Sequence, residues 1–179
     1  RSMPGNSSNP GFFRARLGGR DVRFGPRSQP PFLDPGEYRL TVPGGRDIGP
    51  FAATFTGPSP IEWTNRDRMD AVDRSRELVM EWRGAAPDRL VIVLATNIDR
   101  VSTASGTVLC AALPAAGHLT IAPEILANLP ASTSDNGRIP YNRLFLGTVP
   151  AKTSPVEASG LNAGAIIGLY TTGRFVDYK

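Results

Sequence analysis

Few residues in this sequence have types and spacing suited to catalysis or metal binding. His118 is the sole histidine, and the chain has no G-x-S-x-G turn to supply the nucleophile of a serine–histidine hydrolase. Zinc prefers several histidine or cysteine ligands, whereas this chain contains one of each, His118 and Cys110. We therefore expect His118 to be an ordinary solvent-facing or hydrogen-bonded side chain. We predict no catalytic residue, no metal site and no cofactor.

Acidic residues form two further candidate sites. Glu77 and Glu81 share one face of an expected strand, where four residues at about 3.3 Å each separate them by roughly 13 Å. Glycosidases hold their two carboxylates about 5–9.5 Å apart, so a hydrolase is the weakest function hypothesis and needs acids from different strands. Asp67, Asp70 and Asp73 are spaced by three without a glycine, whereas calcium loops use alternate positions. Arginines lie between them, so we interpret them as partners in surface ion pairs.

Charge and hydropathy restrict the partners. The net charge is +4, and 18 of the 20 basic residues are arginines because Lys152 and Lys179 are the only lysines. Acidic residues are interspersed among them, which indicates a mixed surface rather than a nucleic-acid-binding stripe. The longest strongly apolar run, Leu90 to Ala95, is too short to span a bilayer. We expect neither nucleic-acid binding nor membrane insertion.

Strands are the elements that must position these residues. Apolar and polar side chains alternate from Phe13 to Leu17, Glu37 to Val42, Phe51 to Phe55 and Leu78 to Trp82, as in strands with one buried face. Leu90 to Ala95 is apolar on both faces, which predicts a central strand covered on each side. Weaker strand candidates are Thr107 to Ala112, His118 to Ile121, Arg143 to Val149, Pro155 to Ala158, Ala165 to Tyr170 and Arg174 to Tyr178.

Turn residues separate the strands. The chain contains 19 glycines and 17 prolines, and many of them punctuate the apolar runs. Pro123 to Leu129 predicts a short helix, while Asn65 to Arg76 and Ser132 to Arg138 predict polar loops. About ten short strands at this spacing predict an all-β, two-layer antiparallel β-sandwich with one short helix. We expect residues 1–10 to form a flexible N-terminal segment and residues 11–179 to form a single β-sandwich domain.

Three side chains are candidates for the core. Trp63 and Trp82 lie on strand-like alternations, which favours packing over sugar stacking or an interface. Cys110 alternates with Val108 and Ala112 on an apolar face, where a thiol behaves as a small hydrophobic group.

Seven motifs follow one another along the chain: Phe32 to Tyr38, Gly44 to Phe51, Ile61 to Asn65, Glu81 to Gly84, Val108 to Ala112, Ile121 to Pro130 and Ser159 to Gly164. In their order and spacing they resemble a sandwich domain of uncharacterised exported proteins from Acidobacteria. The resemblance runs from about Gly11 to the C-terminus, and it implies an immunoglobulin-like sandwich and export to the periplasm, cell surface or medium. Members of the family carry additional strand sequence before the segment that matches Gly11 to Phe13, so we expect either that this chain is a shortened version or that its first sheet edge is completed from elsewhere. No residue inherits a role.

These observations favour a non-enzymatic structural or interaction domain, with an accessory subunit of a larger envelope complex as one variant. Its partner is then another protein, in a larger complex or a homo-oligomer. Two segments form the predicted interaction surface, the uncovered N-terminal edge and the arginine-rich loop, which would meet an acidic partner. Its residues are Phe12, Arg14, Arg16, Arg66, Arg68, Arg74 and Arg76.

A carbohydrate-binding module is the alternative, because sandwiches often present aromatic rings to sugars. It requires at least two coplanar, exposed rings, for which Tyr141, Phe145, Tyr170 and Tyr178 are the candidates.

Overall fold

The computed structural model describes residues 36–57, 59–99, 102–132 and 142–179. The chain divides after Phe32, and every described residue belongs to the second unit, residues 33–179. The predicted strand from Phe13 to Leu17, the predicted domain boundary at residue 10 and most of the predicted loop from Ser132 to Arg138 lie outside the described residues.

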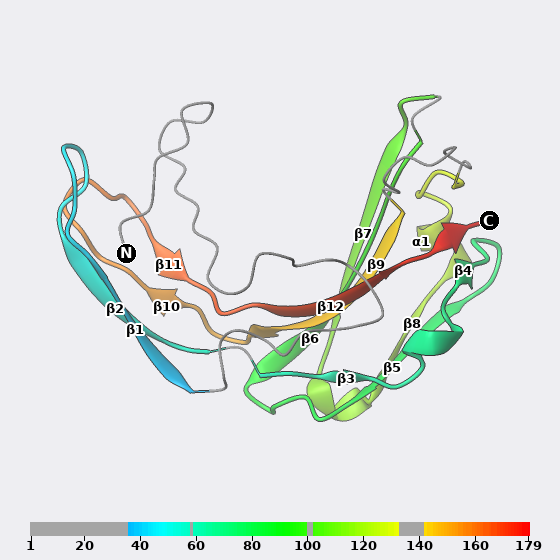
Figure 1. Ribbon diagram of the computed structural model, residues 1–179, viewed down its shortest axis with the longest axis horizontal. Helices are drawn as coiled ribbons and strands as arrows, with labels where there is room; N and C mark the ends of the chain where they lie inside the picture. The colour runs from blue at the N-terminus through cyan, green and yellow to red at the C-terminus, as the bar shows by residue number, and fades with distance from the viewer. Residues whose placement is uncertain (1–35, 58, 100–101, 133–141) are drawn as a thin grey trace. The chain divides into compact units, whose positions relative to one another are not determined.

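A four-stranded antiparallel sheet forms one layer of the domain (Figure 1). Its strands follow the order β12-β9-β6-β7, with β12 at Tyr170–Phe175, β9 at Arg143–Pro150, β6 at Arg89–Ile98 and β7 at Ser105–Ala112. β6 is thus central, as its apolar run predicts. Val91 and Val93 on its inner face are fully buried, whereas Ile92 and Leu94 on its outer face are half-buried, so the expected cover on both sides is complete on one side only.

The second layer is a three-stranded antiparallel sheet in the order β3-β5-β8. β3 spans Glu62–Trp63, β5 spans Leu78–Arg83 and β8 spans His118–Ile121. Alternate residues of β5, Leu78, Met80 and Trp82, are buried, because a strand points every second side chain to the same face. They form one apolar cluster with the inner residues of β6 and β9. The two sheets therefore pack face to face around a common core.

Smaller elements close the ends of this core. α1 (Pro123–Leu126) begins at a proline, as predicted, and buries Leu126; Leu129 after it is also fully buried. A one-turn 3-10 helix, η2 (Pro114–Ala116), connects β7 to β8. Tyr178 lies on β13 (Asp177–Tyr178) and belongs to the same core cluster.

The segment from Asn65 to Arg76 is not the loop that the sequence predicts. It contains a 3-10 helix, η1 (Arg66–Arg68), and a short strand, β4 (Ala71–Val72), which pairs in parallel with β13. The partner strand lies more than a hundred residues further along the chain, so local periodicity carries no sign of this pairing.

Two further strand pairs lie outside the core cluster. β1 (Glu37–Val42) and β2 (Phe51–Thr56) form an antiparallel hairpin, in which the rings of Tyr38 and Phe55 stack with centroids 5.8 Å apart. β10 (Ser154–Pro155) pairs with β11 (Ala165–Ile166) and lies against β2. These bounds correct two predicted strands, because β10 ends at Pro155 and three residues without strand pairing separate β11 from β12.

The structure confirms the predicted fold class. The described residues form mostly antiparallel sheets, the two largest of which face each other as a sandwich, with one short α-helix. Within the described ranges, no helix is long and apolar enough to cross a membrane.

Candidate functional site

The predicted arginine surface contains two exposed members. Arg68 donates a hydrogen bond to Glu81 at 3.4 Å, and Arg76 forms an ion pair with Asp73 at 3.3 Å. Hydrogen bonds from Ser75 lower the pKa of the Asp73 carboxyl. Both arginines keep most of their side chains in solvent, where such pairs contribute little to stability.

The other two arginines of this surface bond to distant backbone carbonyls. Arg66 Nη2 donates to the carbonyl oxygen of Gly173 on β12 at 3.2 Å. Arg74 Nη1 donates to Leu129 at 2.8 Å, and its Nε donates to Lys179 at 3.3 Å. These two side chains tie the segment to the C-terminal strands, so their first role is structural.

The three aspartates of this segment pair with arginines; Asp67 and Asp73 pair with arginines of the segment, as predicted, whereas the partner of Asp70 lies on β12. Asp67 forms an ion pair with Arg66, Asp70 with Arg174 and Asp73 with Arg76. In the part of the chain that the structure describes, no group of three or more histidine, cysteine, aspartate or glutamate side chains is close enough to hold a metal ion.

Phe12, Arg14 and Arg16, the N-terminal part of the predicted surface, lie outside the described residues. Their contribution stays a prediction.

His118 and Cys110 have the ordinary surroundings that the sequence predicts. His118 is exposed at the start of β8, and its Nδ1 lies 3.0 Å from the carbonyl oxygen of Ala116. Cys110 is half-buried and packs against the core beside Val108. Burial raises the pKa of the Cys110 thiol, which disfavours the reactive thiolate.

Both tryptophans are core residues, as predicted. Trp63 and Trp82 are opposite one another on β3 and β5. The indole of Trp82 donates to the carbonyl of Pro114 at 3.1 Å, and that of Trp63 donates to the buried side chain of Asn65 at 2.8 Å. Neither ring forms a sugar-stacking platform.

The aromatic residues proposed for sugar binding do not form an exposed row. Tyr178 is 1% exposed, and its hydroxyl donates to the carbonyl of Arg143 at 2.8 Å. Tyr170 and Phe145 are half-buried, and Tyr141 lies outside the described residues. No placement among the described residues favours a carbohydrate site.

The outer edge of β7 is the first surface that the structure adds. β7 ends its sheet, with β6 on one side, and no other described strand pairs with it. Leu109, in the middle of β7, is 65% exposed, and Leu113, the residue that follows the strand, is also exposed. Half-buried Cys110 and Ala112 of the same strand lie at the margin of the core.

Arg89, at the start of β6, is the second feature that sequence analysis missed. Its side chain is 1% exposed. Nε donates to Thr148 Oγ1 at 3.1 Å, and Nη2 donates to the carbonyls of Thr148 and Gly168. Nη1 is buried and has no hydrogen-bond partner in the described part of the chain. The alternation of Arg89 with Val91 and Val93 was a signal that it belongs to the buried face.

Burial sets the electrostatics of this arginine. Desolvation lowers the pKa of Arg89, and the charge of Asp88 partly opposes that shift. The neutral groups that hold the guanidinium cannot neutralise its charge. Thr148 Oγ1 in turn donates to the carbonyl of Ser59 at 3.1 Å, so the arginine is fixed by a continuous network.

Comparison with protein-family models, curated proteins and solved structures finds no match.

Proposed function

We propose that this domain is a non-enzymatic structural module that binds a second copy of itself through the edge of β7. The supporting observation is the length and chemistry of that edge. Among the described strands that end a sheet, β7 is the longest, at eight residues, and it contains no charged residue and no proline.

Other sheet edges carry features that discourage pairing. Natural proteins protect an edge strand with charge, brevity or cover. β1 carries two charged residues, Glu37 and Arg39. β12 carries Arg174, and the carbonyl of Gly173 on the same strand accepts a hydrogen bond from Arg66. β2 lies against β10, and β3 and β8 are short. β7 is neither charged nor short, and among the described residues no strand covers its outer edge, although the segment from Asn128 to Pro130 lies against Gly106.

A second copy of the chain is the partner that this edge fits. Two β7 strands related by a two-fold axis pair antiparallel. Association then stops at a dimer, because the pairing occupies the β7 edge of both copies. Since β7 is uncharged, the pairing places no like charges opposite each other. The exposed Leu109 side chains of the two copies then lie on the same outer face and shield each other from water.

The mass of the protein in solution, measured by light scattering across a concentration series, tests this proposal. We expect wild-type protein to dimerise reversibly. The variant Thr107→Lys/Ala111→Lys adds two positive charges to exposed positions of β7 and should weaken association at least tenfold, about 1.4 kcal/mol.

Val79→Lys is the matched control. Val79 is an exposed apolar residue on β5, which lies between β3 and β8 and has no free edge. It should dimerise like the wild type. A wild-type protein that stays monomeric at every concentration, or that associates only with a different protein, contradicts the proposal. Equal dimerisation of the β7 variant and the control does so too.

Export and membership of a larger envelope assembly complete the proposal. They rest on the resemblance to exported acidobacterial proteins. Fractionation of cells that make the natural protein, followed by detection with an antibody, tests them. Protein found only in the cytoplasmic fraction contradicts export.

A further inference from the structure

A pocket of about 340 Å³ opens beside Arg89, and no role proposed above uses it. Its wall comes from the end of β2, the start of β6, the connection from β9 to β10, and the segment from β11 toward β12. The lining residues are Phe55, Thr56, Asp88, Arg89, Pro150, Ala151, Lys152, Ser154, Ile166 and Gly168.

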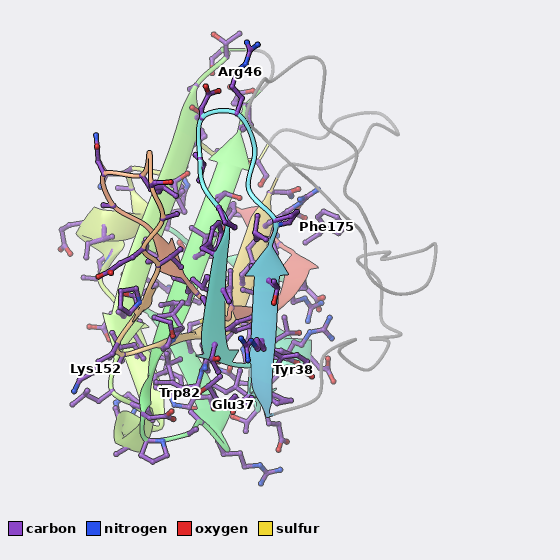
Figure 2. All side chains as sticks on the ribbon, turned by 90° about the vertical axis from the view of Figure 1, so that its left-hand side faces the viewer. Glu37, Tyr38, Arg46, Trp82, Lys152 and Phe175 are labelled. Carbon is purple, nitrogen blue, oxygen red and sulfur yellow. The ribbon has the colours of Figure 1, made fainter. Side chains whose placement is uncertain are left out.

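The charged residues of the wall sum to one positive charge. Arg89 and Lys152 each contribute +1 and Asp88 contributes −1, so the total is +1. Arg89 is fully buried, and its Nη1 has no hydrogen-bond partner among the described residues, whereas Lys152 and Asp88 are exposed. Figure 2 shows Lys152 projecting from the ribbon. A buried cation with an unused donor is unfavourable unless an anion neutralises it.

The remainder of the wall sets the class of ligand. Phe55, Pro150 and Ile166 supply apolar surface beside the cation. The volume is near the lower limit for small-molecule pockets. We propose that this pocket binds a small organic carboxylate, whose single negative charge faces Arg89 and Lys152 and whose apolar body contacts Phe55 and Ile166.

A dianion such as phosphate fits this site less well. The pocket carries one net positive charge, and Asp88 repels a second negative charge.

Titration of the full chain with hexanoate, followed by the chemical shifts of backbone amides, tests the proposal. We expect saturable binding with the largest shifts at Lys152 and Gly168. Hexanol, which has the same chain length without the charge, should bind at least tenfold more weakly, because a hydrogen bond to a charged group is lost. Inorganic phosphate should also bind more weakly than hexanoate.

Variants of the exposed charges separate a binding role from a structural one. Lys152→Gln should weaken hexanoate binding about fivefold, and Asp88→Asn should strengthen it about fivefold, the effect of one unit charge at a few ångströms in water. Binding that depends on the apolar wall alone would leave both affinities unchanged. Arg89→Met should abolish binding, but it removes a buried network, so the two exposed variants decide the test if it fails to fold.

Arg46→Gln is the matched control for net charge. Arg46 is exposed in the turn between β1 and β2, and Figure 2 shows it at the opposite end of the view from Lys152. Its affinity for hexanoate should equal that of the wild type. Absence of saturable binding, shifts centred away from the pocket, or equal effects of Arg46→Gln and Lys152→Gln would overturn the proposal.

Discussion

Asn65→Ala should be among the most destabilising single substitutions in this domain. Asn65 is buried where the backbone pairing of β3 with β5 ends. Its side-chain oxygen accepts from the indole of Trp63 at 2.8 Å and from the amide of Glu81 at 3.2 Å, and its nitrogen donates to the carbonyl of Val79 at 2.8 Å. The carboxamide thus substitutes for a peptide group and extends the sheet by one step.

The expected loss in the free energy of unfolding follows from three groups that lose their partner, namely the indole of Trp63, the amide of Glu81 and the carbonyl of Val79. An unsatisfied buried donor or acceptor costs about 1–3 kcal/mol, and partial access of water to the Val79 and Glu81 backbone reduces the sum. We expect a loss of about 3–5 kcal/mol in the free energy of unfolding. For a domain of this size that corresponds to a fall of roughly 10 °C in Tm.

Urea unfolding followed by tryptophan fluorescence measures this loss directly. The chain contains two tryptophans, Trp63 and Trp82, and both are buried, so their emission reports unfolding of the core. Asn128→Ala is the matched control, because Asn128 is exposed and the bonds of its side chain within the described ranges are to carbonyls of its own helical turn. A loss at Asn65 no larger than the loss at Asn128 would refute the reasoning.

Three further predictions concern groups whose pKa the fold changes. Tyr178→Phe removes the hydrogen bond from the buried hydroxyl to the Arg143 carbonyl and should cost about 1–2 kcal/mol in urea unfolding. Burial raises the pKa of Tyr178. The stability that the neutral, buried hydroxyl contributes is therefore present below the ordinary tyrosine pKa and is lost as the pH rises. Ultraviolet absorbance should show ionisation of Tyr178 only when the domain unfolds. The Glu62 carboxyl accepts two hydrogen bonds from Arg83, which lower the pKa of Glu62. The stabilisation from this pair is therefore present above the ordinary glutamate pKa and is lost on acidification. Arg83→Gln should raise the pKa that NMR titration reports for Glu62. Cys110 should react with a thiol reagent slowly in native protein and rapidly in urea, and equal rates would contradict its burial.

Local alternation predicted the strands well where one face is buried. Glu37 to Val42 alternates and forms β1 with those bounds, and the same rule places Met80 and Trp82 in the core. It was less successful near β10 and β11, because β10 ends at Pro155 and no strand pairing includes the residues between Ile166 and Tyr170. A strand of two residues leaves almost no periodic signal, so its bounds depend on its partner.

For the candidate sites, too, the sequence could predict some features and not others. Ion pairs for Asp67 and Asp73 could be predicted, because Arg66 is adjacent to Asp67 and a turn of the polar segment brings Arg76 back to Asp73. The edge position of β7 could not, since a strand sequence does not specify which strands flank it. The inward bonds of Arg66 and Arg74 also escaped prediction, since their acceptors are on distant strands.

Arg89 illustrates what each level of structure determined. The sequence by itself placed this residue in phase with the buried side chains of β6, because successive side chains of a strand point to opposite faces. Tertiary structure alone decided how a buried guanidinium is held. Its acceptors Thr148 and Gly168 lie 59 and 79 residues away, and only the packing of β6 against β9 and the segment before β12 brings them within hydrogen-bonding distance.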